Sequence, residues 1–316
     1  MYKYDNFQRV KEELEASRTA ARLAADARSA ELGEKSPELA AIDEELRLTG
    51  MMVFKSACEG SDISSIKERN IKLNERRREI IRSLGYPEDY TEPKYSCPVC
   101  SDVGFIDGLK ICNCFKERLF ELNIASSGIG RLIEMQSFDN FDLEWYRSSE
   151  EVYKRMSQNL KTVKKYVNDF AKKGGNLLLL GNTGTGKTHI STAIAREIIT
   201  MGFSVIYDSA ENIMNDYETE RFRSGYGPKE SKTERYVECD LLIIDDLGTE
   251  FNNQFSTVCL YNLINTRRNK GLSTIISTNL SAKDLAERYD GRIYSRIAGS
   301  DYQILNFCGK DHRLYG

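Results

Sequence analysis

Hydrophobic residues recur at intervals of three and four over most of the first 83 positions, beginning with Phe7, Val10 and Leu14. This spacing places apolar side chains on one face and predicts amphipathic helices. The pattern breaks at 33–37 and at 58–62, and in the first break Ser36 followed by Pro37 is typical of a helix start. We predict three helices, packed as an antiparallel hairpin or a small bundle, near residues 7–32, 37–58 and 63–83.

Beyond position 125 the pattern changes to short apolar runs that alternate with helical segments. A run of four or five apolar residues is typical of strands buried on both faces of a parallel sheet. Helical segments lie between the runs, for example at 149–173 and 187–200. This alternation predicts a doubly wound α/β domain with a parallel sheet. The runs that we assign to strands are Leu177–Leu180, Phe203–Tyr207, Leu241–Ile244, Ser273–Ser277 and Tyr302–Phe307.

The first apolar run leads into a glycine-rich turn and then into a helical pattern. The turn reads GNTGTGKT, which is the G-x-x-x-x-G-K-T spacing of a phosphate-binding loop (P-loop). Glycines let backbone N–H groups point at a polyphosphate, and the following helix directs its positive end at the same anion. Lys187 can reach the β- and γ-phosphates, and the Thr188 hydroxyl can bind Mg²⁺. A glycine-rich turn with an incidental lysine is the alternative, but it leaves the flanking strand and helix unexplained. The candidate ATP-binding residues are Gly181, Asn182, Thr183, Gly184, Thr185, Gly186, Lys187 and Thr188.

A later apolar run, residues 241–244, ends in Asp245 and Asp246. The carboxyl ends of parallel strands lie beside the phosphate-binding loop, where Mg²⁺ binds. Asp245 is therefore a candidate to hold Mg²⁺ with Thr188, mostly through water, and Asp246 is placed to orient or activate the attacking water. Asn279 ends the next strand and can reach the γ-phosphate or that water. A strand that merely ends in a capping aspartate is a weak alternative beside a P-loop.

Composition and charge narrow the class of protein. The 316 residues are 40% hydrophobic and 29% charged, with a net charge of −3, which indicates a globular chain of two domains or one domain with an appendage. Because the net charge is small, any contact with nucleic acid must be local. No apolar run reaches the length of a membrane span, and the N-terminus is too charged for a signal peptide. We therefore expect a cytoplasmic protein with no membrane partner, whose clustered cysteines are metal ligands or redox groups.

Four cysteines lie close together in the sequence, and they are Cys97, Cys100, Cys112 and Cys114. Four thiolates in two close pairs predict a tetrahedral Zn²⁺ site, and Asp107-Gly108 between the pairs predicts a β-hairpin turn. The result would be a zinc-ribbon-like module without an open coordination position. An iron–sulfur cluster or redox-active thiols are the alternatives, because thiolate sites also suit those roles.

Aromatic residues precede the phosphate-binding strand at Phe138, Phe141, Trp145 and Tyr146. An aromatic side chain beside a nucleotide site can stack on adenine. For most of these residues the commoner role is to seal the core of the domain.

Four segments together resemble the AAA+ ATPases of the DnaC/DnaI helicase-loader and IstB group. They are Gly181–His189, Leu241–Glu250, Thr274–Asn279 and Arg292–Ile297. The Lys-Thr-His ending of the P-loop is characteristic of that group and adds His189 to the candidate nucleotide-binding residues. The resemblance covers residues 130–316 strongly. Over residues 1–125 it concerns layout only, where helices followed by four cysteines are most similar to the DnaI-type primosomal loaders, including versions carried by phages and mobile elements.

The resemblance implies roles for individual residues. Asn279 resembles the sensor-1 residue, and Arg313 is similar to the sensor-2 arginine that contacts phosphate in its own subunit. Arg296 resembles the arginine finger that completes a neighbouring subunit's site, with Arg292 as the next candidate; a surface salt bridge is the alternative for Arg296. A finger in trans makes ATP turnover depend on self-assembly through the ATPase domain. Many AAA+ proteins have glutamate where this chain has Asp246, and the shorter carboxylate suits a slowly hydrolysing switch.

The resemblance also implies a function. In these loaders the N-terminal part docks on a replicative helicase hexamer and the ATPase part binds single-stranded DNA. Residues 221–235 mix basic and aromatic side chains as a single-strand site would, although a surface loop can have the same composition. The resulting hypothesis is an ATP-dependent loader of a replicative helicase, in which ATP and Mg²⁺ drive assembly and hydrolysis drives release. It divides the chain into a docking region (1–94), a zinc module (95–125) and an AAA+ domain (126–316).

Other functions fit some of the same residues. The first is an IstB-like ATPase that assists a transposase, although the cysteine cluster and the N-terminal helices favour the loader. The second is a stand-alone nucleotide hydrolase or nucleotide kinase, for which the motifs indicate no substrate pocket. The third is a binding module whose nucleotide site does not hydrolyse ATP. The N-terminal helices could also be a spacer rather than a docking arm, since both have a solvated helical pattern.

Overall fold

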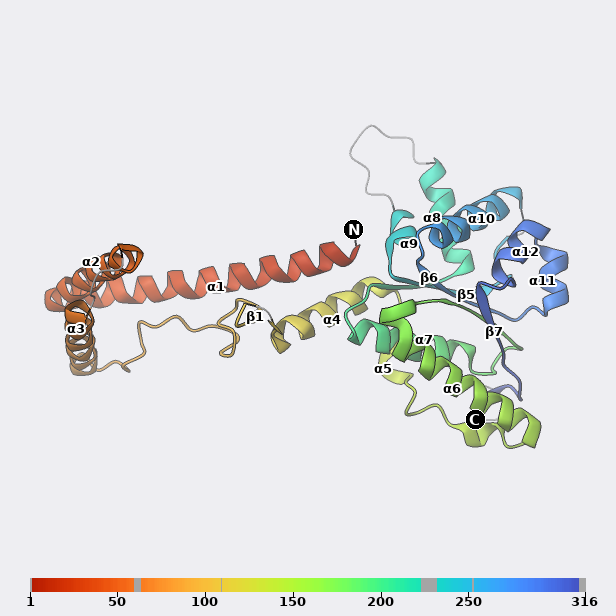
Figure 1. The fold of residues 1–316 in the computed structure, drawn as a ribbon, viewed down its shortest axis with the longest axis horizontal. Helices are drawn as coiled ribbons and strands as arrows, with labels where there is room; N and C mark the ends of the chain where they lie inside the picture. Colours follow the sequence, from red (N-terminus) through yellow and green to blue (C-terminus); the bar gives the residue numbers. More distant parts are fainter. Residues whose placement is uncertain (1, 60–63, 109, 223–231, 252, 313–316) are drawn as a thin grey trace. The chain divides into compact units, whose positions relative to one another are not determined.

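The structure is a computed structural model, and it describes residues 2–59, 64–108, 110–222, 232–251 and 253–312 (Figure 1). The chain folds into two compact units. One unit combines Met1–Val10 with Lys116–Gly316, and the other is Lys11–Phe115. Helices α1 (Tyr2–Lys35) and α4 (Asn113–Ser127) each contribute residues to both units. The division into three functional regions stays a prediction.

The larger unit is built on a five-stranded sheet with the strand order β4-β5-β6-β3-β7. The strands are β3 (Asn176–Leu180), β4 (Val205–Ser209), β5 (Leu241–Leu247), β6 (Ser273–Thr278) and β7 (Tyr302–Asn306). Every neighbouring pair is parallel; Leu180 lies opposite Thr278, and Ser209 lies opposite Asp245. The predicted doubly wound α/β fold is therefore confirmed, and the carboxyl ends of the strands lie along one edge.

Helices cover both faces of this sheet (Figure 1). Leu177 and Leu179 of β3 pack into the core on one face, whereas Leu178 and Leu180 pack into the core on the other. This alternation is the period of two expected for a strand. The first face carries α5 (Leu132–Met135), the 3₁₀ helix η1 (Leu143–Tyr146), α6 (Glu150–Lys173) and α7 (Lys187–Thr200). The second carries α8 (Ala210–Phe222), α9 (Glu234–Glu238), α10 (Gln254–Asn269), α11 (Ala282–Arg288) and α12 (Gly291–Ile297).

The smaller unit contains most of α1 together with α2 (Pro37–Glu59) and α3 (Ser64–Ser83), which confirms the three predicted helices. Pro37 is the first residue of α2, as a first-turn proline should be. A small core joins the three helices, and its buried residues are Leu32, Leu39, Ile42, Ile80 and Ile81. Arg77 of α3 pairs with Asp43 of α2 at 2.6 Å. The helices are thus held by a few apolar contacts and by ion pairs.

A short hairpin follows the three helices. It consists of β1 (Phe105–Ile106) and β2 (Lys110–Ile111), which pair antiparallel. Asp107 and Gly108, at the predicted turn, both have positive φ angles, of 52° and 71°. The hairpin prediction is therefore confirmed, and the hairpin lies between the two pairs of clustered cysteines.

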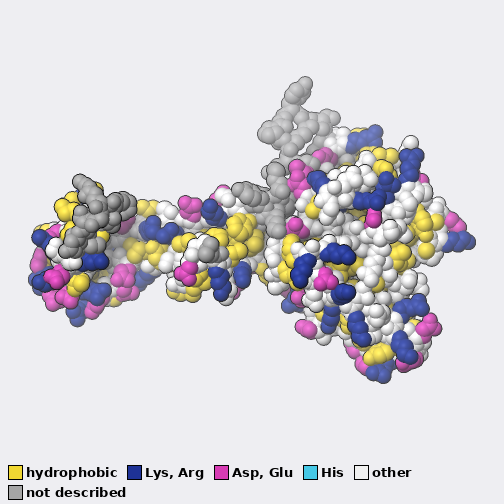
Figure 2. Space-filling model, in the orientation of Figure 1, with side chains coloured by type: hydrophobic (Ala, Val, Ile, Leu, Met, Phe, Trp, Pro, Cys, Tyr) yellow, Lys and Arg dark blue, Asp and Glu magenta, His cyan; other side chains and the backbone are white. Residues whose placement is uncertain are grey.

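Basic and acidic side chains are interspersed on the visible face (Figure 2). Such mixing accords with the small net charge of the chain, −3. Within the described ranges, no helix is both long enough and apolar enough to span a membrane.

Candidate functional site

The phosphate-binding loop joins β3 to α7. Gly184 and Gly186 have φ angles of 73° and 91°, in the left-handed region that favours glycine. A Cβ atom on Gly186 would lie 2.6 Å from Tyr146 Oη and 3.0 Å from the Phe141 ring, so a larger residue has no room there. Tyr146 Oη also donates to the carbonyl of Thr185 at 3.0 Å. The loop is therefore held against aromatic side chains from the segment that precedes α6.

Lys187 begins α7 and is almost fully buried, with 5% of its surface exposed. Its Nζ donates to the carbonyls of Gly181 at 2.6 Å and Asn182 at 2.8 Å, and to Asn279 Oδ1 at 2.6 Å. Because Asn279 directly follows β6, the lysine links the end of that strand to the loop after β3. A positive charge is thus held where the sequence predicts the phosphates.

Asp245 lies in β5 and accepts hydrogen bonds from three hydroxyl groups. Tyr207 Oη donates to Asp245 Oδ2 at 2.6 Å, Thr188 Oγ1 donates to the same oxygen at 3.3 Å, and Ser277 Oγ donates to Oδ1. Burial, and next the charge of Asp245, raise the pKa of Tyr207, so this phenol stays protonated and acts as a donor. The carboxylate and the Thr188 hydroxyl are oxygen groups of the kind that bind Mg²⁺.

Asp246 has a φ angle of 52°, which is uncommon for a residue other than glycine. Its backbone N–H donates to Ser277 Oγ at 3.1 Å, and Asn279 Nδ2 donates to its Oδ1 at 3.5 Å. Ser277 therefore connects the two carboxylate residues, since it donates to Asp245 and accepts from Asp246. Backbone strain of this type is found at functional sites, where the surrounding contacts maintain it.

A cavity of about 370 Å³ lies beside these groups. Its lining includes Lys187, Thr188, Asp246, Asn279, His312 and several residues of the segment 136–146. Sites for small molecules have volumes of roughly 300–1,000 Å³, so the cavity is large enough for a ligand. The structure thus brings together the P-loop, the two aspartates near the carboxyl end of β5 and the asparagine after β6, as their positions near strand ends predict.

His189, two residues after Lys187, contacts the turn that precedes the aromatic segment. Its Nε2 lies 2.8 Å from the carbonyl of Ser137 and 3.0 Å from Asn140 Oδ1. The edge of its ring also meets Phe141, with the ring centres 5.2 Å apart. The histidine therefore positions a wall of the cavity from the helix that carries the P-loop lysine.

Tyr207 and Ser277 were not singled out by the sequence, although both belong to predicted strands. A signal was present, because each places a hydroxyl group near the carboxyl end of a strand adjacent to β5. Which face each side chain occupies could be read only once the register of the strands was known.

Arg296 lies in α12 and makes all its described contacts within the chain. Its Nε donates to Asn265 Oδ1 at 3.2 Å and its Nη2 donates to Tyr261 Oη at 2.9 Å, with the guanidinium 4.5 Å from the centre of the Tyr261 ring. Arg292, one turn earlier, is exposed. Neither arginine lines the cavity of its own chain. Arg313 lies outside the described residues.

The basic segment 221–235 is described only at its ends, since residues 223–231 lie outside the described ranges. Arg235 forms ion pairs with Asp208 at 3.2 Å and with Asp216 at 2.9 Å. Arg221 places its guanidinium 4.9 Å from the centre of the Phe255 ring. Both described arginines therefore contact side chains of their own unit.

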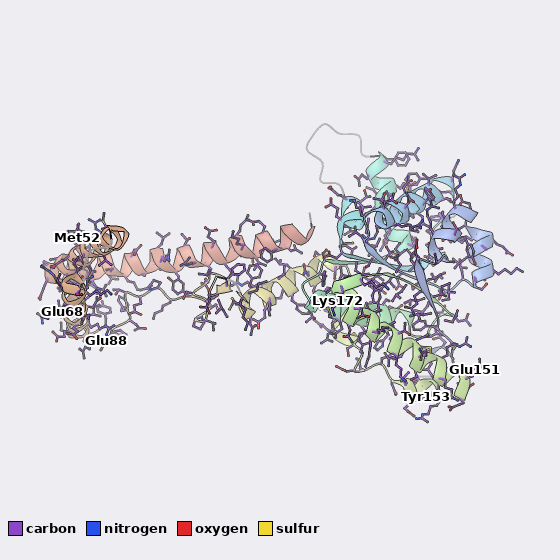
Figure 3. All side chains as sticks on the ribbon, in the orientation of Figure 1. Met52, Glu68, Glu88, Glu151, Tyr153 and Lys172 are labelled. Atoms are coloured by element: carbon purple, nitrogen blue, oxygen red, sulfur yellow. The ribbon has the colours of Figure 1, made fainter. Side chains whose placement is uncertain are left out.

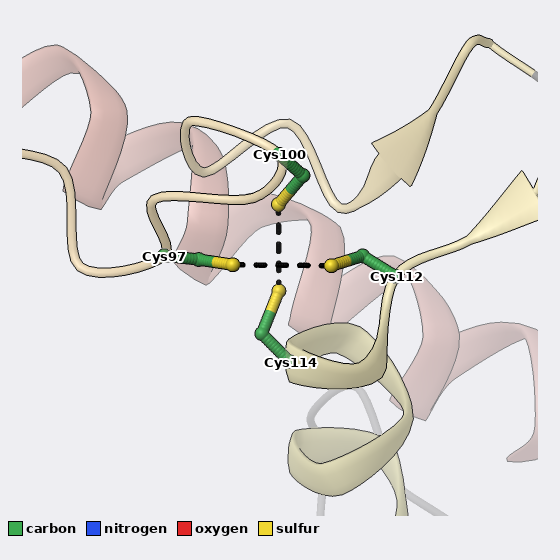
Figure 4. Close-up of side chains that lie close together, drawn as sticks. All are labelled: Cys97, Cys100, Cys112 and Cys114. Carbon is green, nitrogen blue, oxygen red and sulfur yellow. Dashed lines mark hydrogen bonds between the residues drawn. The ribbon is translucent and has the colours of Figure 1, made fainter.

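The four clustered cysteines of the smaller unit converge on one point (Figure 4). Their sulfur atoms all lie within 4.8 Å of one another, with 3.8 Å between Cys97 and Cys112 and 3.5 Å between Cys100 and Cys114. Four sulfurs at about 2.3 Å from a tetrahedral metal would be about 3.8 Å apart, so the spacing fits a metal ion. Hydrogen bonds from the backbone around Cys100 lower the pKa of the Cys97 thiol to about 7, whereas burial raises the pKa of the Cys100 and Cys114 thiols.

Asp102 supports this cluster from the loop between its first two cysteines and the hairpin. The carboxylate is 1% exposed and accepts hydrogen bonds from the backbone N–H groups of Cys97 at 2.7 Å and Ser96 at 3.0 Å. Ser17 of α1 donates to the same carboxylate at 2.9 Å. The cysteine loop is therefore fixed both by its own backbone and by the long first helix.

Known proteins show similarity mainly to the larger unit. Residues 125–292 match the family described as IstB-like ATP binding protein. The replicative helicase loader DnaC of Buchnera aphidicola subsp. Acyrthosiphon pisum is 24% identical over 192 residues, covering 61% of this chain and 75% of DnaC. The phage-like element PBSX protein XkdC of Bacillus subtilis is 26% identical over 239 residues, which cover 69% of this chain and 85% of XkdC. A crystal structure of DnaI has a TM-score of 0.47 and 21% identity, covering 59% of this chain and 95% of that chain.

The family match includes the P-loop, strand β5 with its two aspartates, and Asn279. It extends over more than half of the 316 residues. The parallel sheet and the cavity beside the P-loop agree with an ATP-binding fold. The chain therefore belongs to the IstB-like ATP-binding proteins, within the AAA+ ATPases of the DnaC/DnaI and IstB type.

Proposed function

We propose that this chain is an ATP-dependent loader of a replicative DNA helicase. The observation that carries the proposal is similarity to replicative helicase loaders across the ATPase unit, with 24% identity over 192 residues in the Buchnera example. The structure adds a buried lysine and the Asp246 carboxylate at one cavity, with Asp245 hydrogen-bonded to Thr188 in its lining. Together these favour a nucleotide-controlled assembly factor over a stand-alone enzyme or a module that does not hydrolyse ATP.

In this proposal ATP binds with its phosphates at Lys187, and Mg²⁺ is held by Thr188 and Asp245. Mg²⁺ would neutralise charge that develops on the phosphates. Asp246 orients or activates the attacking water, and Asn279 contacts the γ-phosphate or that water. The hydrogen bond from Asn279 to Asp246, at 3.5 Å, supports a shared role for these two residues. Hydrolysis is slow, because Asp246 has a shorter side chain than the glutamate found at this position in many AAA+ proteins. Hydrolysis then acts as the signal for release.

Self-assembly completes the site in this proposal. Arg296 of one copy reaches the nucleotide of the next copy and stabilises the charge that develops during hydrolysis. For this it must leave Tyr261 and Asn265, whose contacts would hold it until a neighbour binds. Arg313 contacts phosphate within its own chain. Single-stranded DNA binds through the ATPase unit, with residues 221–235 as the candidate segment.

The N-terminal helices dock on the helicase hexamer. On α2, Leu48, Met51 and Met52 follow a three- and four-residue spacing and are 43%, 62% and 56% exposed. Met52 is labelled in Figure 3. Exposed apolar residues on one side of a helix are typical of a surface that binds another protein. The cysteine cluster binds Zn²⁺ in this proposal and keeps the adjoining hairpin folded.

A pull-down with a purified replicative helicase hexamer tests the loader proposal. The full-length chain should be retained by the hexamer in the presence of ATP and Mg²⁺. The double variant Met51→Glu with Met52→Glu should lose most of the binding, because it places charge on the proposed docking face. Leu23→Glu, at an apolar residue of α1 that is 64% exposed, is the matched control.

Failure of the wild-type chain to bind the hexamer would contradict the loader proposal. Capture of a transposase in a parallel assay would support the alternative, an ATPase that assists transposition. The helicase-loader relatives favour binding to the helicase hexamer over capture of a transposase.

A further inference from the structure

Two buried polar atoms that line the nucleotide cavity have no hydrogen-bond partner. They are Gln136 Oε1 and His312 Nε2, and the statement applies to the described part of the chain. Leaving a buried donor or acceptor unpaired is destabilising, so most such atoms in proteins have a partner. Two of them in the lining of one cavity indicate that the cavity binds a ligand with matching polar groups.

The wall around these atoms is aromatic. The rings of Phe141 and Tyr146 stack with their centres 5.7 Å apart, and both residues are almost fully buried. The ring of His312 packs in T-shaped contacts with the rings of Trp145 and Tyr146, with the ring centres 5.3 Å and 4.9 Å apart. Trp145 remains 48% exposed and lines the cavity. Flat aromatic groups beside unpaired polar atoms fit a heterocyclic base better than they fit a phosphate group.

The turn that carries Gln136 is fixed in place. Asn140 Nδ2 donates to the carbonyl of Met135 at 2.7 Å, and Asn140 Oδ1 accepts from the backbone N–H of Ser137 at 2.7 Å. His189 Nε2 lies 3.0 Å from the same oxygen. The carboxamide of Asn140 is therefore occupied in holding the turn, which leaves that of Gln136 for a ligand. Since His189 belongs to α7, the turn is positioned relative to the P-loop.

The polarity of the two atoms favours one kind of base. A carboxamide oxygen only accepts hydrogen bonds, and a neutral imidazole nitrogen without a proton also accepts. Burial lowers the pKa of His312, so the ring is neutral at physiological pH. Adenine presents an amino group at C6, which donates two hydrogen bonds, whereas guanine presents a carbonyl oxygen there. The Gln136 oxygen, and His312 Nε2 when the ring proton is on Nδ1, would accept from the amino group of adenine and repel the carbonyl oxygen of guanine.

We propose that Gln136 reads the 6-amino group of adenine, with His312 as a second acceptor, and so makes the site selective for ATP over GTP. The proposal rests on the proposed nucleotide function of the P-loop but not on the helicase partner. Gln136 is then a specificity residue, and His189 and Asn140 are positioning residues that act through its turn. The triphosphate is held separately, by Lys187 and the loop backbone.

The test compares three nucleotides that differ at C6, with affinities measured by calorimetry on the full-length chain in Mg²⁺. They are ATP, purine riboside triphosphate, which lacks the amino group, and GTP, which replaces it with a carbonyl. One lost hydrogen bond lowers affinity about tenfold. The wild-type chain should therefore prefer ATP at least about tenfold over the other two, and Gln136→Ala should reduce that preference to about twofold or less.

Two variants and one further ligand separate recognition from structural damage. Gln136→Glu keeps an acceptor and should keep the preference for the amino group. Gln158→Ala, at an exposed position of α6, is the matched control and should bind as the wild type does. The affinity of inorganic tripolyphosphate should be the same in wild type and Gln136→Ala, because it lacks a base.

The outcomes distinguish the two proposals. If Gln136→Ala keeps the wild-type preference for ATP, or loses tripolyphosphate binding as well, the assignment of Gln136 is wrong while ATP binding at the P-loop stands. If the wild-type chain binds none of the three nucleotides, the proposed nucleotide function itself fails.

Discussion

At the scale of single residues, the site depends on how the carboxylate of Asp245 is solvated. It is 9% exposed and accepts hydrogen bonds from Tyr207, Thr188 and Ser277. Hydroxyl groups orient and solvate a carboxylate, but they do not neutralise it. A buried carboxylate held by neutral donors therefore favours a bound cation, in agreement with the proposed Mg²⁺.

Tyr207→Phe removes one of these donors while keeping the ring. We expect the free energy of unfolding to fall by about 1–3 kcal/mol, because a buried carboxylate loses a hydrogen bond. Urea unfolding followed by circular dichroism measures the change. Tyr294→Phe, at a half-buried tyrosine of α12, is the control and should stay within about 0.5 kcal/mol of the wild type. Equal stability of the two variants would show that the Tyr207 hydroxyl does not support Asp245.

At the scale of secondary-structure elements, α10 is joined to its neighbours by a buried arginine. Arg267 is fully buried, and its guanidinium donates to Thr274 Oγ1 at 3.0 Å and to the carbonyls of Tyr236 at 2.7 Å and Cys239 at 3.0 Å. One side chain thus links α10 to β6, to α9 and to the residue that directly follows α9. Carbonyl groups that would otherwise be unpaired in the core receive their hydrogen bonds from it.

Arg267→Ala should therefore lower the free energy of unfolding by more than about 3 kcal/mol, since it leaves a cavity and several unpaired carbonyls. The adjacent Arg268 is half-exposed and pairs with Asp301 at 2.6 Å. Arg268→Ala should cost no more than about 1 kcal/mol, as is usual for surface ion pairs. Chemical denaturation of both variants makes the comparison, and similar losses in the two would contradict a special role for Arg267.

The hairpin β1–β2 is the element that most needs outside support. Each of its strands has two residues, and isolated hairpins are marginal in water. The convergence of four sulfur atoms beside it suggests that a metal supplies the support.

Protein purified without chelator should contain one zinc ion per chain by elemental analysis. Cys97→Ser should lose that zinc and melt at a lower temperature, because metal binding contributes directly to the folding of small metal modules. Cys308→Ser, at a half-buried cysteine outside the cluster, should keep it. Iron in place of zinc, or a wild-type chain without metal, would contradict this assignment.

At the scale of the whole molecule, the ATP site in one chain is expected to be incomplete. Arg296 does not line the cavity of its own chain and instead contacts Tyr261 and Asn265. If Arg296 acts on a neighbouring copy, hydrolysis requires assembly. The rate per chain should then rise with protein concentration.

Mixing two impaired variants tests this arrangement. Lys187→Ala should not bind ATP, and Arg296→Ala should bind ATP but hydrolyse it at least about tenfold more slowly, as is typical when a group that stabilises the transition state is lost. An equimolar mixture should regain part of the activity, because Lys187→Ala chains still provide Arg296 to their neighbours. Arg292→Ala is the control from the same helix. Wild-type activity of Arg296→Ala alone would rule out its role as the finger.

Much of the fold could be predicted because local patterns agreed with it. Pro37 begins α2, the apolar runs became strands, and Asp107 with Gly108 formed the turn of the hairpin. Short elements were missed. The seven residues of α12 were read only as a motif, although Asp290 caps the helix by accepting from the backbone N–H groups of Arg292 and Ile293. A single turn or two of helix has too few positions to show a hydrophobic period.

The boundaries of longer helices depended on caps rather than on hydrophobic spacing. The apolar spacing alone predicts a helix over residues 260–268, whereas α10 begins earlier, at Gln254. Asn253 precedes it and accepts a hydrogen bond from the backbone N–H of Ser256 at 2.8 Å. Asparagine is a favoured N-cap, so the signal was in the sequence but outside the apolar pattern.

The sequence by itself determined the phosphate-binding loop, the two aspartates near the carboxyl end of β5 and the cysteine cluster. Each of these is a set of residues close together along the chain, so spacing alone defines its chemistry. The tertiary structure decided which distant residues complete them. Tyr207 reaches Asp245, and Gln136 shares a cavity with Lys187 and His312. Such neighbours follow from strand register and from the packing of helices on the sheet, which no local pattern specifies.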